Sequence, residues 1–134
     1  MENINVLLLL TPKEELSYLT ETTSVKQAVE KMRFHGFMAL PVISKNGEYI
    51  GTISEGDLLY AIVDEEMDDE YMSETLIIDI IRKEYTPAVK VDADMNTIIQ
   101  MITAQNFVPV IDDRNILMGI VTRRRVLQEL CKNK

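Results

Sequence analysis

The chain of 134 residues contains one sequence pattern twice. Residues 39–59 hold an apolar run, a turn, a second apolar run and then a polar step, and residues 109–127 repeat this order at a constant offset. The equivalent pairs are Pro41 and Pro109, Gly47 and Asn115, Gly51 and Gly119, Ser54 and Thr122, and Asp57 and Arg125. A repeat of this kind constrains the architecture before any other signal, because each copy must form the same supersecondary unit.

Each copy predicts a β-hairpin that leads into a helix. Asn46 and Gly47 suit a two-residue turn, which needs positive φ at both positions. Asn115 stands in the place of Gly47, and Asn is the residue besides Gly that adopts the left-handed region most readily. Ser54 is the predicted N-cap of the following helix, and Asp57, three residues later, completes a capping box.

An amphipathic helix is predicted before each hairpin. Apolar residues recur at i, i+3, i+4 and i+7, which is the spacing of one helix face; they are Val25, Ala28, Val29 and Met32 in the first copy and Met95, Ile98, Ile99 and Ile102 in the second. Ser24 and Asp94 are the predicted N-caps. Gly36 and Asn106 are expected to end these helices in the left-handed conformation.

The start of each copy completes the pattern. Residues 4–10 predict a short helix that closes before Pro12, and residues 15–19 alternate as in a strand. Residues 76–82 and 86–91 correspond to them in the second copy. The fold class is therefore α/β, with each copy running helix–strand–helix–strand–strand–helix. The boundaries that we expect are 1–66 for the first repeat, 67–75 for an acidic linker and 76–134 for the second repeat.

The composition excludes several classes of function. The formal net charge is −8, whereas nucleic-acid binding usually depends on a basic surface, so no nucleic-acid partner is expected. The longest apolar run is too short to span a membrane, so no membrane association is expected. The lone Cys131 excludes an internal disulfide and indicates a cytoplasmic protein. Its alignment with Val63 on the apolar helix stripe predicts a core position.

No residue pattern predicts catalysis or a metal site. Residues 64–70 form an acidic run, which either continues a helix outward or forms an exposed linker. Its carboxylates suit hard cations, but they do not follow an ordered Ca²⁺-loop pattern. His35 is the only histidine and is expected to be exposed at a helix end, without a nucleophile–base partner. We therefore expect a protein that is not an enzyme and holds no metal.

The repeated pattern resembles the cystathionine-β-synthase (CBS) domain, in which an apolar residue, Pro-Val, a turn, Gly, two apolar residues and Ser/Thr follow in this order. Two copies over nearly the whole chain resemble a CBS pair, or Bateman module. The resemblance implies two pseudo-twofold related β-α-β-β-α repeats, each with a preceding short helix. It also implies an adenine nucleotide, AMP or ATP, in the cleft between the repeats, and pairing into a homodimer.

A narrower resemblance concerns the second copy. Its shorter loop before Pro109 and the sequence Thr122-Arg123-Arg124 are similar to small stand-alone CBS proteins of Gram-positive bacteria. Those proteins bind cyclic di-AMP and act by engaging partner proteins. The resemblance therefore adds cyclic di-AMP to the candidate ligands and an unidentified regulated protein to the expected partners.

The resemblance implies, position by position, that Ser54 and Asp57 are the ribose-binding pair. The chemistry agrees, because a carboxylate can accept both ribose hydroxyls and a helix N-terminus adds backbone donors. The adenine would lie between two segments of the first copy, where backbone groups could contact its edge; these are Ser17 with Tyr18, and Met38 with Ala39. The alternative is that Ser54 and Asp57 only cap a helix.

The second copy carries cations where the first carries the acid. Arg125 cannot accept from ribose hydroxyls, because a guanidinium only donates hydrogen bonds. Arg123 and Arg124 follow Thr122 at a helix start, where cations oppose the helix dipole, and their planar forks suit phosphate. We therefore expect Arg123 and Arg124 to contact the phosphates of the ligand, with Thr122 beside them as a further ligand-binding residue. The alternative is that these arginines form salt bridges with the acidic run.

Two functions follow from these features. The first is a regulatory module that senses an adenine nucleotide and alters the binding of another protein, with no cofactor other than this ligand. The second is a constitutive dimeric adaptor with no physiological nucleotide. Calorimetry with AMP, ATP and cyclic di-AMP separates the two, because the adaptor gives no heat with any of them.

Overall fold

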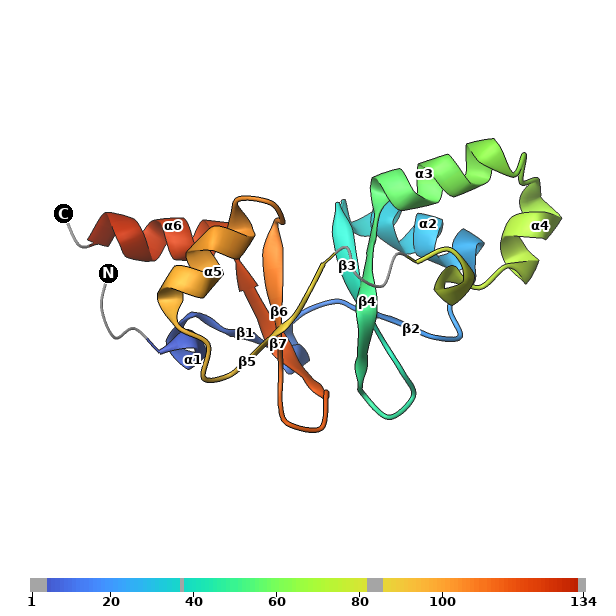
Figure 1. The fold of residues 1–134 in the computed structure, drawn as a ribbon. Helices are drawn as coiled ribbons and strands as arrows, with labels where there is room; N and C mark the ends of the chain where they lie inside the picture. The colour runs from blue at the N-terminus through green and yellow to red at the C-terminus, as the bar shows by residue number, and fades with distance from the viewer. Residues whose placement is uncertain (1–4, 37, 82–85, 133–134) are drawn as a thin grey trace. The chain divides into compact units, whose positions relative to one another are not determined.

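The computed structural model describes residues 5–36, 38–81 and 86–132. These residues divide into two compact units (Figure 1). Unit 1 contains the described residues up to Leu16 together with those from Thr86 onward, and unit 2 contains those from Ser17 to Ile81. The units are therefore not the two contiguous repeats in sequence, because the start of the chain belongs with the second copy.

Unit 2 is built on a three-stranded sheet. Its strands lie in the order β2 (Leu19–Thr20), β3 (Ala39–Ile43) and β4 (Tyr49–Ser54), with β2 parallel and β4 antiparallel to β3. Leu40 pairs with Ile53, and Leu19 pairs with Val42. Because side chains alternate along a strand and paired residues share a face, all four point to one side of the sheet.

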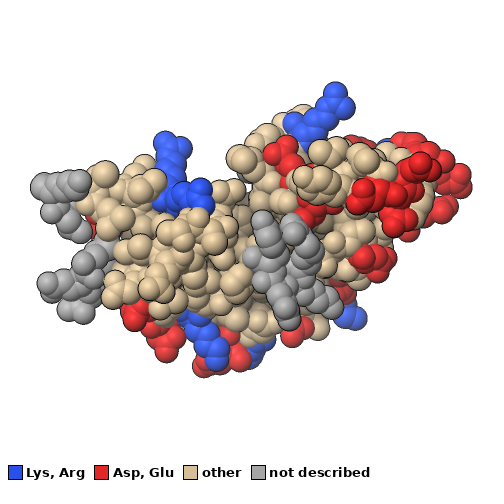
Figure 2. All heavy atoms as spheres, turned by 45° about the horizontal axis from the view of Figure 1, so that its top comes forward, with Lys and Arg blue, Asp and Glu red and all other residues tan. Residues whose placement is uncertain are grey.

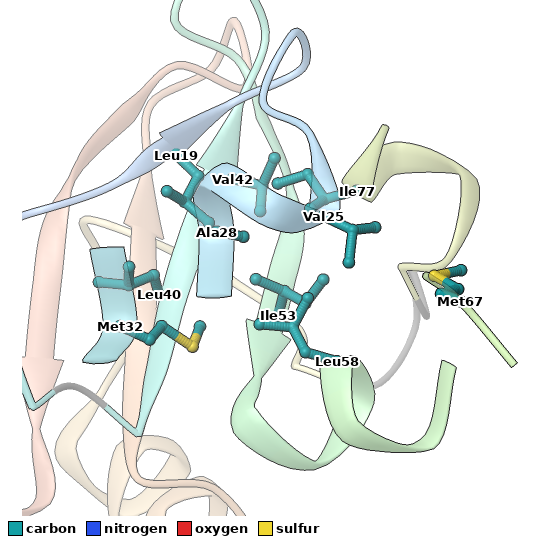
Figure 3. Close-up of a cluster of buried hydrophobic side chains, with 10 residues drawn as sticks. All are labelled: Leu19, Val25, Ala28, Met32, Leu40, Val42, Ile53, Leu58, Met67 and Ile77. Atoms are coloured by element: carbon teal, nitrogen blue, oxygen red, sulfur yellow. The ribbon is translucent and has the colours of Figure 1, made fainter. Parts of the chain in front are cut away.

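Two helices cover this face of the sheet in unit 2: α2 (Val25–His35) and α3 (Glu55–Asp64). Val25, Ala28 and Met32 of α2 and Leu58 of α3 are buried with the strand residues in a single cluster (Figure 3). The predicted stripe is therefore the core-facing side of α2. Burying each large aliphatic side chain contributes about 1.5–3 kcal/mol of favourable transfer free energy.

Local capping residues fix both ends of α2, as predicted. The Ser24 hydroxyl accepts from the Gln27 backbone N–H at 3.1 Å, and the Gln27 side chain accepts from the Ser24 N–H at 2.9 Å. Gly36 ends the helix at φ 71°, and its N–H donates to the Met32 carbonyl. A side chain is costly at this φ, so glycine is the natural residue to end the helix.

The hairpin loops differ from the predicted two-residue turn. Gly47 has φ 90°, whereas Asn46 is not among the described residues with positive φ. The Gly47 N–H donates to the Ser44 carbonyl at 3.0 Å and the Ser44 N–H to the Glu48 carbonyl at 2.8 Å. The loop is thus a longer turn in which only its last position is left-handed. The prediction of two positive-φ positions was wrong.

Asn115 takes the Gly47 position in unit 1, as the repeat predicts, with φ 69°. The two loops also share a side-chain acceptor that sequence comparison missed. The Ser44 hydroxyl accepts from the backbone N–H groups of Asn46 and Glu48, at 3.2 and 3.1 Å. A carboxylate oxygen of Asp112 accepts from the corresponding groups of unit 1, at 2.8 and 3.0 Å, and these bonds lower the pKa of Asp112.

Unit 1 has a four-stranded sheet because the start of the chain adds a strand. The order is β1 (Thr11–Pro12), β7 (Leu117–Thr122), β6 (Phe107–Ile111) and β5 (Val89–Lys90). Pro12 pairs with Gly119, and a Cβ on Gly119 would overlap the Thr11 carbonyl oxygen. Glycine is thus required for β1 to approach β7 so closely.

Helices α1 (Val6–Leu9), α5 (Met95–Ile102) and α6 (Arg123–Lys132) complete unit 1. Val108 pairs with Val121 and Val89 with Val110, so these valines share a face of the sheet. Val6 and Leu9 are buried in the same cluster as the stripe of α5. The short helix before Pro12 was predicted, but its place in the core of the second copy was not.

The end of α5 differs from the end of α2. The helix stops at Ile102, and Asn106 is not among the described residues with positive φ. The predicted left-handed Asn106 was therefore wrong. The backbone N–H groups of Ala104 and Gln105 donate to the Met101 carbonyl, each at 3.1 Å. The chain thus closes the helix with a turn and needs no left-handed residue.

The acidic run continues into a further short helix, α4 (Asp69–Glu74), in unit 2. The Asp68 carboxylate caps it by accepting from the Tyr71 N–H at 2.8 Å, and Glu66 before it has φ 50°. Figure 2 shows acidic side chains gathered over α4 and the end of α3. Lys26 of α2 pairs with Asp69 at 2.9 Å, and this partner raises the pKa of Lys26.

Three other predictions need correction. Of the predicted strand 15–19, only Leu19 is in a strand, because Lys13–Glu15 forms a 3-10 turn, η1. The predicted helix 76–82 is a single 3-10 turn, η2 (Ile77–Asp79), and its last residue lies outside the described residues. Cys131 is exposed. Its equivalent Val63 is 61% exposed as well. The preceding residues Ile62 and Leu130 do pack against the cores, so the buried edge of each helix is narrower than the predicted stripe.

Candidate functional site

Ser54 and Asp57 form the predicted capping box at the start of α3. The Asp57 N–H donates to the Ser54 hydroxyl at 3.1 Å, and the Ser54 N–H donates to the Asp57 carboxylate at 2.9 Å. The Asp57 side chain is held in place by this bond, and the residue is only 8% exposed. A buried carboxylate at a helix N-terminus is a fixed acceptor for hydroxyl groups.

A cavity of about 280 Å³ lies beside this carboxylate within unit 2. Tyr60 and Ala61 of α3 line it together with Asp57, and Ile80 closes it from beyond η2. Tyr60, Ala61 and Ile80 were not predicted as site residues. Tyr60 could have been predicted from the sequence, because it follows Asp57 by three residues and residues at this spacing lie on one helix face. Ile80 could not have been predicted, because it is distant from Asp57 in the sequence and belongs to no motif.

The structure also brings Met38 and Ala39 to this end of unit 2. Ala39 pairs with Ser54 across the hairpin, and the Glu55 N–H donates to the Met38 carbonyl at 2.9 Å. The side chain of Met38 is exposed, so it remains accessible. Ala39 does not exchange ladder hydrogen bonds with β4, because Met38 does so and these bonds alternate along an antiparallel pair. The Ala39 carbonyl therefore points toward the β2 side of β3.

Ser17 and Tyr18 directly precede β2, which runs parallel to β3. The start of β2 and the start of β3 are therefore at the same edge of the sheet. The Lys31 ammonium group donates to the Tyr18 carbonyl at 2.7 Å, so a side chain of α2 holds this segment. The role of Lys31 was not predicted from the sequence, because its partner lies thirteen positions away and no motif links the two residues.

The three consecutive arginines of unit 1 have different surroundings. Arg123 donates to the backbone carbonyls of Ile102 and Gln105, at 2.8 and 3.2 Å, so its guanidinium caps the end of α5. Arg125 pairs with Glu129 on its own helix at 3.3 Å. Arg124 is exposed, and no described residue forms a hydrogen bond or ion pair with its side chain.

Thr122 is the cap of α6, as its alignment with Ser54 predicts. Its hydroxyl accepts from the Arg125 N–H at 3.1 Å. The second half of the capping box is absent here, because a guanidinium cannot accept the reciprocal bond. The two helix starts thus have the same backbone design, but only that of unit 2 offers a carboxylate.

The described residues contain no cluster of metal-ligating side chains. In the same residues, we find no helix with both the length and the apolar character needed to cross a membrane.

Several solved structures share this fold over most of their length. CbpB in complex with c-di-AMP is 27% identical, with a TM-score of 0.88 over 96% of this chain and 85% of that chain. CbpB from Streptococcus agalactiae is 28% identical, with a TM-score of 0.84 over 92% of this chain and 78% of that chain. CBSX2 in complex with AMP has a TM-score of 0.79 at 24% identity, over 97% of this chain and 98% of that chain, and shows the fold alone.

The curated relatives are longer proteins. Uncharacterized protein MK0525 of Methanopyrus kandleri is 29% identical over 80% of this chain, which spans 54% of that protein. Homoserine O-acetyltransferase of Methanocorpusculum labreanum is 27% identical over 78% of this chain, which spans only 20% of that protein. The CBS domain family model matches residues 10–64 and 70–132. Both copies of the internal repeat thus match one model, and the chain belongs to the CBS domain family.

Proposed function

We propose that this chain is a regulatory module that binds an adenine nucleotide and thereby alters the binding of a partner protein. The observation that carries the proposal is the fixed, buried Asp57 carboxylate beside a cavity of about 280 Å³. The ligand is AMP, ATP or cyclic di-AMP. The likeness to CbpB, which was solved with c-di-AMP, supports cyclic di-AMP among them.

In this proposal, Asp57 accepts the ribose hydroxyls and the capping box holds it for that task. An ionised carboxylate offers about four lone-pair sites, so the bond from the Ser54 N–H does not exhaust what Asp57 can accept. Capping and ribose binding are therefore compatible, and the same geometry serves both. The adenine lies against the segments around Tyr18 and Ala39, where backbone groups contact its edge.

Arg124 is the proposed phosphate ligand. Its side chain is exposed and has no partner among the described residues, whereas Arg123 and Arg125 already use their guanidinium groups within unit 1. An unpaired guanidinium binds phosphate at a smaller cost in free energy, because it does not first have to break hydrogen bonds to another acceptor. Arg123 was expected to contact the phosphates as well. In this proposal, Arg123 and the predicted ligand-binding residue Thr122 instead fix the helix start that carries Arg124.

Substituting Arg124→Ala is expected to weaken AMP binding about 10-fold or more, because a charge-assisted hydrogen bond is worth about 1.5–3 kcal/mol. Isothermal titration calorimetry measures the dissociation constant directly. Arg114→Ala is the matched control, since Arg114 is an exposed arginine on the hairpin loop of the same unit. Equal AMP affinity in the wild type and the Arg124 variant would remove Arg124 from the site.

Titration of the wild-type chain with AMP, ATP and cyclic di-AMP tests the proposed function itself. Binding of at least one of them supports a sensor. If none of the three gives heat and none protects the chain against thermal unfolding, the chain is a constitutive adaptor instead. A true ligand raises the melting temperature, because it binds only the folded state.

We further propose that a second copy of this chain covers the exposed face of α2 and α3. A groove of about 270 Å³ between these helices is lined by apolar Val29, Met32 and Leu59 and by charged Arg33 and Glu55. Opposite charges beside one apolar groove favour a symmetric pair, in which Arg33 of each copy faces Glu55 of the other. This homodimer would carry the regulated surface.

Substituting Leu59→Glu is expected to convert the dimer to a monomer, because it buries an unpaired charge at the proposed contact. Leu59 is 58% exposed, so the fold tolerates the change. Sedimentation velocity measures the mass. Lys45→Glu on the exposed hairpin loop of unit 2 adds the same acid elsewhere and should leave the mass unchanged. A Leu59 variant with the mass of the wild type would reject this surface.

A further inference from the structure

The side chain of Gln105 bridges two backbone carbonyls of unit 1. Its amide nitrogen donates to the Phe107 carbonyl at 2.9 Å and to the Pro87 carbonyl at 3.3 Å. Phe107 is the first residue of β6, and Pro87 lies two residues before β5. One NH₂ group therefore closes the edge of the sheet where β5 and β6 begin.

Strand pairing identifies the equivalent carbonyls in unit 2. The pair of Val89 with Val110 in unit 1 is equivalent to the pair of Leu19 with Val42 in unit 2. Phe107 pairs with Thr122, and Ala39 pairs with Ser54. Two residues before Val89 and Leu19, Pro87 therefore corresponds to Ser17. Three residues before Val110 and Val42, Phe107 corresponds to Ala39. These are two of the residues at which the adenine edge is proposed to lie.

The two units differ in what meets these carbonyls. Among the described residues, no side chain donates to the carbonyl of Ser17 or to that of Ala39. In unit 1 a carboxamide NH₂ occupies this place, and it offers the same two donors as the exocyclic amino group of adenine. Gln105 thus supplies within the chain what a 6-aminopurine would supply as a ligand.

Local structure explains why Gln105 can reach these carbonyls. Helix α5 ends at Ile102, whereas α2 continues to His35, which corresponds to Gln105 in the alignment of the helices. Gln105 therefore lies beyond the helix, and its own backbone carbonyl is held by the Arg123 guanidinium at 3.2 Å. The early helix end and the Arg123 contacts together place the carboxamide.

We propose that Gln105 is an internal plug of the base site in unit 1, which excludes a second purine and limits the chain to one adenine nucleotide. The inference rests on the proposed function, because it takes the base position of unit 2 as its reference. It assigns Gln105 a role in setting stoichiometry, and Arg123 the role of a positioning residue for this plug.

The experiment compares two variants that differ only at Gln105, with AMP as the probe. Arg125→Asp restores the carboxylate that unit 1 lacks at the Asp57 position but keeps the plug, so it is expected to bind one AMP per chain, like the wild type. Arg125→Asp combined with Gln105→Ala is expected to bind two, which doubles the calorimetric stoichiometry. Native mass spectrometry of the same samples counts the bound molecules independently.

Three outcomes overturn the plug while leaving the proposed function standing. They are two AMP molecules bound to the wild-type chain, two bound to the Arg125→Asp variant, and one bound to a folded double variant. If the wild-type chain binds no AMP, ATP or cyclic di-AMP, the proposed function itself fails and the plug fails with it.

A measurement on the wild-type chain keeps the inference testable if the double variant does not fold. The Gln105 side-chain NH₂ signals in a ¹⁵N-correlation spectrum are expected to stay unchanged when AMP saturates the chain, because the nucleotide binds elsewhere. Movement of these signals to the position of a free glutamine amide at saturating AMP would mean that the purine displaces the plug, and would overturn it.

Discussion

Substituting Asp57→Asn is expected to weaken AMP binding about 10- to 100-fold while leaving the fold intact, because hydrogen bonds to a charged acceptor contribute about 1.5–3 kcal/mol each. The amide oxygen of Asn can still accept from the Ser54 N–H, which the Asp57 carboxylate accepts at 2.9 Å. The amide NH₂ group, however, donates and so cannot receive a ribose hydroxyl. Calorimetry for affinity and thermal unfolding for stability separate the two effects.

The control for this change is Asp68→Asn. Asp68 caps α4 in the same unit by accepting from the Tyr71 N–H at 2.8 Å, and it does not line the cavity. The substitution removes the same charge from the same kind of position, a carboxylate at a helix start. AMP affinity should therefore fall in the Asp57 variant alone. If both variants bind AMP as the wild type does, Asp57 only caps the helix.

Substituting Gly119→Ala is expected to destabilise the chain by about 3 kcal/mol or more, which is the upper end of overpacking effects. A Cβ at this position would overlap the Thr11 carbonyl oxygen and would also lie 3.0 Å from the Leu10 side chain. The Thr11 carbonyl belongs to the backbone and cannot move aside as the end of a flexible side chain can. Strand β1 must therefore separate from β7. We expect the melting temperature to fall by about 10 °C.

Gly56→Ala is the matched control for this experiment. Gly56 lies in the first turn of α3, and a Cβ there would be 3.7 Å from the Ser54 hydroxyl oxygen and 3.8 Å from the Tyr60 ring, which are ordinary contacts. Alanine favours the helix by about 0.5–1 kcal/mol relative to glycine. The Gly56 variant should thus gain stability. A Gly119 variant that melts with the wild type would contradict the close strand approach.

Features that depend on neighbouring residues were predictable from the sequence. The caps Ser24, Ser54, Asp94 and Thr122 all accept from the backbone three residues ahead, because the geometry of a helix start is set within four residues. The apolar stripe of α5 is buried as its spacing predicts. The capping box at Asp57, the centre of the candidate site, belongs to this class.

Features that depend on distant residues were not predictable. A two-residue strand such as β1 has no periodicity, so its pairing with β7 carried no signal. The long side chain of Arg123 reaches the Ile102 carbonyl twenty-one positions earlier, and the same motif would equally have suited a phosphate ligand. The exposure of Cys131 depends on how α6 is turned over the core, against which Leu130 packs, and the apolar spacing does not determine this.

The pairing of β1 with β7 joins two segments that lie on either side of unit 2 in the sequence. Unit 2 is encoded by one contiguous segment, so it can fold as soon as that segment has left the ribosome. Unit 1 has to wait for β7, because the whole of unit 2 is synthesised between β1 and β7. The residues of β1 therefore stay without their sheet partner while unit 2 is made, and unit 1 requires the larger loop-closure entropy and forms second.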